Sequence, residues 1–403
     1  MCIYNKEKKM KKAEIYAYYF PNWHVDERNE QWHGKGWTEW NVVKCALPKF
    51  EGHYQPRVPL WGYEDESDPV VFAKKIDCAT TYGIDGFVFD WYWVDGKPYR
   101  KKCIEDGFLK AKNCEKIKFA LMLCNHDPSS SHPSPRTPRS FPLGTTKYTP
   151  DEFDRITSYC IEHYFDKKNY IRIDGKLYFS IFSMGKFILD IGGIESAKRE
   201  IDKFRAKVRD RGLGEIHFSC IDNQGALLRK ILNGEMGDVD VVGKQGGKVV
   251  TDFEAYNVVA KILGIDSVNT HLVGLPPAQE FPKAHFDGWL EIFEEFCVKR
   301  NNTYKIPYNL CVTVGWDPSP RTVQSDVYEE VGYPFTKIIY GNTPEKVGKL
   351  FEIAKNIYER EETTAKCIFL HSFNEWTEGA YLEPDEKYGY GYLEELKRVF
   401  KNY

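Results

Sequence analysis

Short apolar runs, rich in aromatic and β-branched residues, alternate with longer stretches of mixed polarity along the chain. The apolar runs predict buried strands at 14–20, 84–93, 117–124, 176–183, 215–221, 238–243, 309–315 and 366–373. The stretches between them predict helices, among them 69–82, 151–164, 195–211, 251–263, 287–299, 345–360 and 390–401. The helix at 69–82 has the clearest start, because Asp68 suits the N-cap and Pro69 suits the first helical position.

Strands that are separated by helices pair in parallel through right-handed crossovers. Eight such units in 403 residues predict an α/β fold, a (β/α)8 barrel with long loops at its C-terminal mouth. An open doubly wound sheet is the alternative, but no strand run leads into a Gly-x-Gly-x-x-Gly segment. We expect a flexible N-terminus over residues 1–13 and a single barrel domain over 14–403.

Two long segments lack a regular pattern. Residues 21–67 are rich in Trp, His and Gly, and residues 125–149 are dense in Pro and Ser. Both follow predicted strands, so in a barrel they would lie at the mouth, where active sites are built. We expect the first segment to contribute to a binding surface and the second either to act as a lid or to be disordered.

Charge and hydropathy narrow the classes of function. The 56 basic and 59 acidic residues leave a net charge of −3, which gives no electrostatic basis for binding nucleic acid. Mean hydropathy is −0.53, and no apolar run approaches the ~18 to 20 residues that span a bilayer. The basic start is followed by a short apolar run that ends at Pro21, which is not typical of a signal peptide, so we expect a cytoplasmic location. The eleven cysteines include no Cys-x-x-Cys pair and predict buried thiols in a reducing compartment.

The strongest candidate for chemistry follows the last predicted strand. Glu375 and Glu378 are three residues apart, and on one helical turn their side chains would share a face. Two close carboxylates cannot both ionise freely, so one becomes an acid and the other a base near neutrality, as glycoside hydrolysis requires. The alternative is a pair of solvated loop acids. Asn374 and Trp376 beside them favour a sugar site.

Several motifs in chain order resemble one known family. They are AYYFPNWH, GKGWTEWNVVKCALPKFEGHYQPRVPL, GIDGFVFDWYW, VTVGWDPSPRT and FNEWTEGAYLEP…YGYGYLEEL. These segments look like those of WbsX-type proteins, relatives of glycoside hydrolase family 99, the endo-α-mannosidases and endomannanases. The family implies a (β/α)8 barrel, in agreement with the strand count. The chain departs from the usual pattern after the third strand, where CNHDPSSSHPSPRT stands, and this leaves the substrate open.

The resemblance also implies roles for the two acids of Asn-Glu-Trp-x-Glu-Gly. Glu378 would be the general acid/base, and Glu375 would be the base that acts on the sugar 2-hydroxyl. The implied intermediate is a 1,2-anhydro sugar and not a glycosyl-enzyme.

Aromatic residues make up 15% of the chain, which fits a large core and also a carbohydrate site. Candidate sugar contacts lie at predicted strand ends; they are Tyr18, Tyr19, His24, Asp90, Trp91, Trp93, Asn125, His126, Trp316, Asn374 and Trp376. His126 and Asp127 either touch sugar or hold their loop together. Arg321 either clamps an anion or pairs locally with Asp317, and the pair is the simpler expectation. No zinc-site spacing is present, so we expect no metal and no cofactor.

These observations favour a retaining glycoside hydrolase, endo-acting on an α-linked, mannose-like oligosaccharide or polysaccharide. One alternative is a glycosyltransferase of surface polysaccharide (O-antigen) biosynthesis, for which the sequence offers no convincing donor-nucleotide motif. The other alternative is an inactive carbohydrate-binding barrel, which the retention of both glutamates disfavours.

Overall fold

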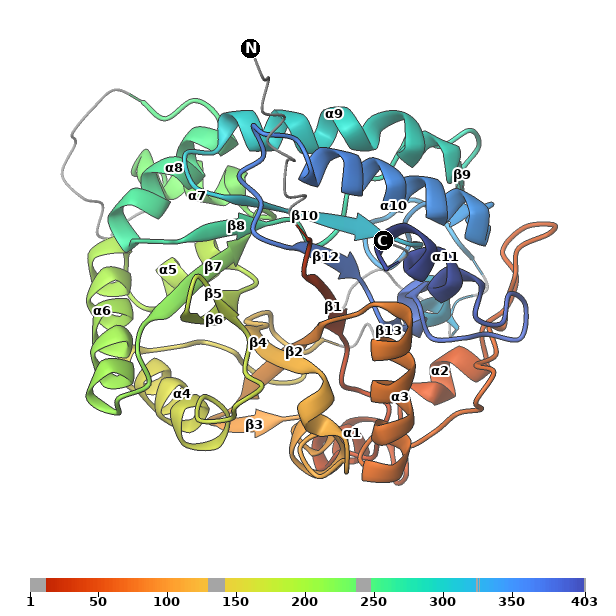
Figure 1. The fold of residues 1–403 in the computed structure, drawn as a ribbon, viewed down its shortest axis with the longest axis horizontal. Coiled ribbons are helices and arrows are strands. Elements are labelled where there is room, and N and C mark those ends of the chain that lie inside the picture. The colour runs from red at the N-terminus through yellow and green to blue at the C-terminus, as the bar shows by residue number, and fades with distance from the viewer. Residues whose placement is uncertain (1–11, 130–141, 237–247, 324, 326, 402–403) are drawn as a thin grey trace, which may run out of the picture.

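The computed structural model describes residues 12–129, 142–236, 248–323, 325 and 327–401. In this part of the chain, eight parallel strands close into a barrel (Figure 1), which confirms the predicted fold class. They are β1 (Ile15–Tyr19), β2 (Gly86–Val94), β4 (Lys118–Leu123), β6 (Lys176–Ile181), β7 (Ile216–Ile221), β8 (Ser267–Asn269), β10 (Tyr308–Thr313) and β12 (Ile368–His371). They pair in chain order, and β12 pairs with β1 to close the barrel.

The strands are buried along their whole length, with one face in the barrel interior and one under helices, so most of their residues are apolar. Closure places Tyr16 opposite Gly86 on β2, and Ala17 opposite Leu370 on β12. A side chain at Gly86 would meet the Tyr16 ring at 2.9 Å, so the tight packing at this point requires glycine.

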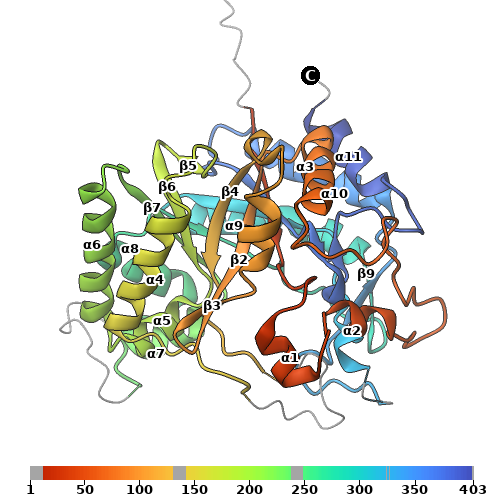
Figure 2. The ribbon, with the colours of Figure 1, turned by 90° about the horizontal axis from the view of Figure 1, so that it is seen from below.

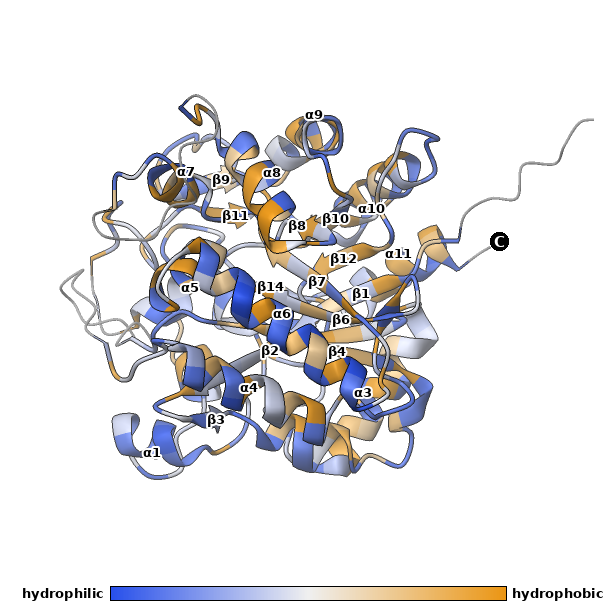
Figure 3. Cartoon of the chain, turned by 90° about the vertical axis from the view of Figure 1, so that its left-hand side faces the viewer, coloured by the Kyte–Doolittle hydropathy of each residue, from blue (hydrophilic) through white to orange (hydrophobic). Residues whose placement is uncertain are grey.

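An outer layer of helices covers the strands (Figures 1 and 2). The longer helices are α3 (Pro69–Tyr82), α4 (Pro150–His163), α6 (Ile194–Asp210), α8 (Asp252–Leu263), α9 (Asp287–Thr303), α10 (Pro344–Tyr358) and α11 (Gly391–Phe400). Each lies within a few residues of a predicted helix. As predicted, α3 begins at Asp68, whose carboxylate accepts a hydrogen bond from the Val70 backbone N–H. Figure 3 shows hydrophobic colour along the strands and alternating polarity along α6, which buries Phe204 and Val208.

Smaller elements decorate the barrel. Short helices are α1 (Glu27–His33), α2 (Trp40–Lys44), α5 (Met184–Asp190) and α7 (Gly225–Leu232), with helical turns at Cys103–Phe108, Cys114–Lys116, Ser319–Thr322 and Trp376–Glu378. Short strands are β3 (Lys97–Tyr99), β5 (Arg172–Ile173), β9 (Lys283–His285), β11 (Ile338–Tyr340), β13 (Asn374–Glu375) and β14 (Ala380–Tyr381). Of these, α1 and α2 follow β1, β3 follows β2, and the β13–β14 hairpin follows β12. The carboxyl ends of the barrel strands therefore lead into one shared mouth.

The structure corrects one strand of the prediction. Residues 238–243 lie outside the described residues, and the barrel position between β7 and β10 belongs to β8, Ser267–Asn269. Three residues with two polar side chains give no apolar run, so the pattern offered no signal there. Of the predicted N-terminus 1–13, only residues 12 and 13 are described. Four cysteines of the predicted strands (Cys124, Cys220, Cys311 and Cys367) are buried, as expected.

No helix within the described residues combines the length and the apolar character that crossing a membrane requires.

Candidate active site

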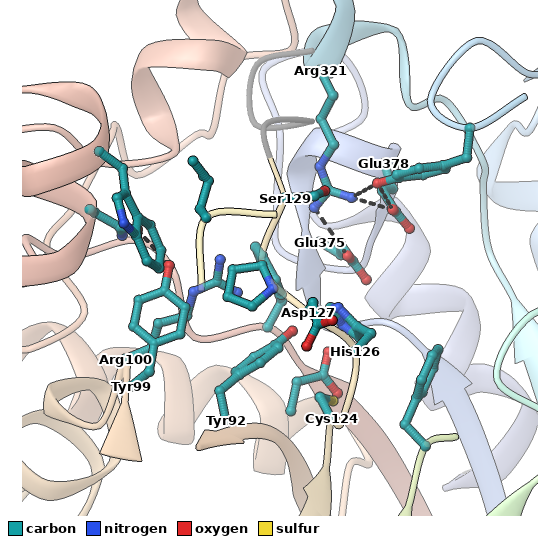
Figure 4. A pocket seen from close by; sticks show the side chains of 18 of the residues that line it. Tyr92, Tyr99, Arg100, Cys124, His126, Asp127, Ser129, Arg321, Glu375 and Glu378 are labelled. Carbon is teal, nitrogen blue, oxygen red and sulfur yellow. Dashed lines mark hydrogen bonds and ion pairs between the residues drawn. The ribbon is translucent and has the colours of Figure 1, made fainter. Parts of the chain in front are cut away.

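A cavity of about 420 Å³ opens at the C-terminal mouth of the barrel (Figure 4). This volume falls in the range of roughly 300 to 1,000 Å³ that is typical of small-molecule sites. Its walls come from segments far apart in the sequence: the end of β2, the loops after β1, β4 and β12, and the turn after β10. Both Glu375 and Glu378 line it, so the structure brings the two predicted acids together.

The two glutamates sit on a rigid hairpin. Glu375 ends β13, and Glu378 ends the helical turn that follows it. The backbone N–H of Glu375 donates to the Ser372 hydroxyl at 2.9 Å. The side chain of Asn374 forms a pair of hydrogen bonds with the backbone of Phe20, at 2.8 and 2.9 Å. Trp376 stacks on Tyr381 and is fully buried, so Asn374 and Trp376 hold the hairpin in place and do not line the cavity.

Arg321 links the two acids. Its guanidinium bonds to an oxygen of Glu378 and lies 3.4 Å from an oxygen of Glu375. It also donates to Glu39 at 3.0 and 3.2 Å, and Glu39 in turn accepts from the Thr377 hydroxyl at 2.5 Å. A single cation therefore organises three buried carboxylates, and residues 21–67 supply one of them.

Glu378 has the properties of a general acid. Its side chain is 8% exposed, and burial together with the nearby charge of Glu375 raises its pKa from 4.5 to about 7. Arg321 and the Tyr333 hydroxyl, which donates to it at 2.7 Å, act in the opposite direction but do not cancel the shift. A carboxyl group with this pKa holds a proton near neutral pH and can release it.

The expected local pair between Arg321 and Asp317 is wrong. Asp317 instead accepts from His53, Gln55 and Arg57, at 2.8, 2.7 and 3.1 Å, deep beside the mouth. These partners come from the segment 21–67, more than 250 residues away in the chain. The short distance along the chain favoured a pair between Arg321 and Asp317. In the folded protein, donors from the segment 21–67 lie beside Asp317 instead.

The side chains at the carboxyl end of β2 alternate between the cavity and the helix-covered face of the barrel. Asp90 and Tyr92 line the cavity, and one buried carboxylate oxygen of Asp90 has no hydrogen-bond partner among the described residues. Burial and the charge of Glu375 raise the pKa of Asp90 well above its usual range. Trp91 and Trp93 point to the opposite face, where they pack on Tyr159 of α4. Since side chains alternate along a strand, the two tryptophans cannot reach the cavity from which Asp90 is accessible.

The candidates near β1 also lie away from the cavity. Tyr19 packs under α3 and donates to Glu66 at 3.0 Å. His24 contacts the same carboxylate at 3.2 Å and is fully buried. Tyr18 lies in the barrel interior against His271 and Phe369, and in the described part of the chain its hydroxyl has no hydrogen-bond partner.

After β4, the structure separates the remaining candidates. His126 lines the cavity beside Tyr92. Asn125 is buried and exchanges two hydrogen bonds with the Ser183 backbone, which ties two loops together. Asp127 also lines the cavity and holds Thr146 across the base of its loop. Residues 130–141, the centre of the predicted lid, lie outside the described residues.

Trp316 sits behind the cavity wall. Its indole donates to the Thr336 hydroxyl at 3.0 Å, and its ring centroid lies 6.3 Å from that of Tyr333. It supports a lining residue and does not itself line the cavity.

Two histidines that the sequence did not single out lie at the base of the site. His371 approaches Glu375 at 3.4 Å, and its ring meets that of His271 with centroids 4.4 Å apart. Burial and the neighbouring His371 lower the pKa of His271 well below its usual value. One ligand atom from each of His271, His371 and Glu375 lies within 4.8 Å of the others, so the three are the described residues best arranged to hold a divalent cation.

Sequence reasoning missed much of the lining. It placed the segment 21–67 at the mouth but did not single out Trp32 or Trp37, which face the cavity. Tyr92 shares its face of β2 with Asp90, so strand alternation carried a usable signal. Arg100 follows the short strand β3, and Tyr333 follows Arg321 at some distance, and neither position showed any pattern.

Comparisons with known proteins agree with this architecture. The family described as "Glycosyltransferase WbsX" matches residues 15–396, and the chain belongs to that family, as its motifs suggested. Among curated relatives, an "Uncharacterized protein WxcX" of Xanthomonas campestris pv. campestris (strain B100) is 25% identical over 391 residues, 96% of this chain and 49% of the relative. The chain thus spans about half the length of the curated relatives it matches.

Two solved structures share the fold. The GH99 endo-alpha-mannosidase from Bacteroides thetaiotaomicron is 14% identical, with a TM-score of 0.54 over 96% of this chain and 95% of that one. A "Glycoside hydrolase-like protein" is also 14% identical, with a TM-score of 0.57 over 98% and 96%. These likenesses show the (β/α)8 barrel fold, and the chemistry of this chain has to be argued from its own site.

Proposed function

We propose that this chain is a retaining glycoside hydrolase, endo-acting on an α-linked, mannose-like glycan. The observation that carries the proposal is a pair of buried carboxylates on one arginine, in which the pKa of Glu378 is raised to about 7. Environments that push two carboxyl groups apart in pKa assign one as acid and the other as base. The barrel fold shared with a GH99 endo-alpha-mannosidase supports the same assignment.

In the proposed reaction, Glu375 takes the proton of the sugar 2-hydroxyl. The freed O2 electron pair attacks the anomeric carbon, and the glycosidic bond breaks as Glu378 gives its proton to the leaving oxygen. Water then opens the 1,2-anhydro sugar: Glu378 takes a proton from the water, and Glu375 returns its proton to O2. Both steps invert the anomeric carbon, so the product keeps the starting configuration.

Arg321 fits this route because its positive charge offsets the negative charge of the glutamates, while the pKa of Glu378 still stays raised to about 7. One guanidinium nitrogen lies 3.4 Å from a carboxylate oxygen of Glu375. Unpartnered buried atoms of Asp90 and His271 supply hydrogen-bond sites for sugar hydroxyls. Trp32, Trp37 and Tyr92 offer flat apolar faces for the sugar ring.

The family's description favours a second candidate, a glycosyltransferase. A screen of α-mannan oligosaccharides, read by mass spectrometry beside a panel of sugar nucleotides, separates the two. We expect shortened oligosaccharides without any nucleotide. Elongated products that form only with a sugar nucleotide would establish the transferase instead.

A further inference from the structure

The cavity holds a second arginine that forms no ion pair with a described carboxylate, although Glu39 and Asp90 lie near enough to act on its charge. Arg100 follows β3, lines the cavity and is 7% exposed (Figure 4). Among the described residues, no carboxylate lies within ion-pair distance of its guanidinium, and its buried Nε has no hydrogen-bond partner. Asp26 accepts only from the backbone N–H of Arg100, at 3.1 Å.

Three aromatic rings enclose this cation. The guanidinium carbon lies 4.6 Å from the ring centroids of Tyr92 and Tyr99 and 5.0 Å from that of Phe20. Ring faces attract a cation but accept no hydrogen bond in the guanidinium plane, and of these rings only Tyr99 brings a hydroxyl that interacts with Arg100. An arginine does not escape burial by losing its proton, so its remaining donors, the buried Nε–H among them, require an anion or another acceptor.

The other charges of the cavity do not meet this need. Arg321 already carries Glu39, Glu375 and Glu378. Asp90 lies on the same wall as Arg100, and the burial that raises its pKa favours its neutral form. Asp127 lines the cavity too, but one of its oxygens is engaged by Thr146. Arg100 is thus the lining arginine left available to a ligand.

We propose that Arg100 binds an anionic substituent of the glycan, so that the substrate is an acidic sugar chain. This inference rests on the proposed function and names the substrate class of the same cavity. The planar guanidinium fork matches a carboxylate or a phosphate through two parallel hydrogen bonds. Figure 4 shows Arg100 across the cavity from Arg321, so the anionic group lies on the side of the sugar away from the two glutamates.

Binding to the Glu378→Gln variant tests the inference independently of catalysis. The probes are methyl α-glycosides of mannose, glucose and galactose, each as the neutral sugar, the 6-carboxylate and the 6-phosphate. Titration calorimetry should show at least tenfold tighter binding of one acidic form over its neutral counterpart. The two acidic arms distinguish a uronic acid from a phosphate ester.

Variants of Arg100 then assign the effect. Arg100→Met in the same background should remove the preference for acid, while neutral sugars bind as before and the melting temperature does not fall, because an uncompensated buried charge is lost. Arg100→Lys should keep a weakened preference, and Arg199→Gln, on the exposed face of α6, should change nothing. If Arg100→Met does not fold, the salt dependence of binding takes its place. The acid preference of the Glu378→Gln protein should shrink between about 20 mM and about 500 mM salt, because dissolved ions screen the attraction between opposite charges.

Three outcomes would overturn the inference: equal binding of neutral and acidic forms, an acid preference that survives in Arg100→Met, or no binding by any acidic probe. Each of these binding results can be measured whether the protein is a hydrolase, a transferase or a binding protein. Failure here is therefore distinct from failure of the proposed function.

Discussion

Replacing the general acid should make the protein more stable, and only at neutral and alkaline pH. Burial and the charge of Glu375 raise the pKa of Glu378 from 4.5 to about 7. The folded state therefore holds this proton more tightly than the unfolded chain does. Stability accordingly falls as the pH rises from about 4.5 to about 7, and the full penalty persists above that range. Glu378→Gln keeps the shape of the protonated acid and cannot ionise.

The magnitude follows from the shift in pKa. At 1.36 kcal/mol per pH unit, the ionised form costs about 3 kcal/mol of folding free energy at pH 8. With roughly 2.1 cal/mol/K of unfolding entropy per residue, a chain of this length converts that to a melting-temperature rise of about 3 to 4 °C. At pH 4 both proteins carry a neutral side chain, and the difference should vanish.

Thermal unfolding of the wild type and Glu378→Gln from pH 4 to pH 9 measures this difference. Glu51→Gln, an exposed glutamate in a turn, is the matched control and should give no pH-dependent difference. Two results would show that burial and repulsion do not destabilise ionised Glu378. One is a difference in melting temperature between wild type and Glu378→Gln that stays constant across this range, and the other is a Glu378→Gln protein that melts below wild type at pH 8.

Four further outcomes are expected. Glu375→Gln and Glu378→Gln should each lose at least a hundredfold in kcat, and an activated aryl glycoside should rescue only Glu378→Gln, because its leaving group needs no proton; equal rescue of both would contradict the roles. Activity should fall through an apparent pKa of about 7 as pH rises, and Tyr333→Phe should move that limb upward, because the lost hydroxyl favours ionised Glu378; a downward shift would show that the tyrosine acts otherwise. A 2-deoxy or 2-fluoro substrate should bind and stay intact, and a trapped glycosyl ester on Glu375 in the intact-protein mass would refute the epoxide route. Exhaustive chelation should leave activity unchanged, whereas a loss restored by zinc would assign His271 and His371 to a metal.

Local chemistry made much of the fold predictable. The start of α3 followed from Asp68 and Pro69, because capping depends on residues within one turn. The barrel strands were recognisable because two buried faces leave continuous apolar runs. Strand β8 has only three residues, two of them polar, and its place depends on pairing with β7 and β10.

The site was predictable only where its residues are close in sequence. Glu375 and Glu378 lie on one hairpin, so their spacing was informative. The acidic partners of Arg321 are 54 to 282 residues away, and no pattern along the chain encodes such contacts. Arg100 could not be singled out for the same reason. What distinguishes it is the lack of an ion-pairing carboxylate among the described residues around it, and only the folded cavity reveals this.

The most direct measurement follows the fate of solvent oxygen. Substrate glycans are incubated in H₂¹⁸O without any sugar nucleotide, and the released sugars are weighed by mass spectrometry. If the chain is a retaining hydrolase, each released sugar carries one ¹⁸O at its new reducing end, and NMR shows that its anomeric configuration is initially retained. Glu378→Gln should release no sugar. Glycans that stay intact in water, yet are extended when a sugar nucleotide is supplied, would contradict it.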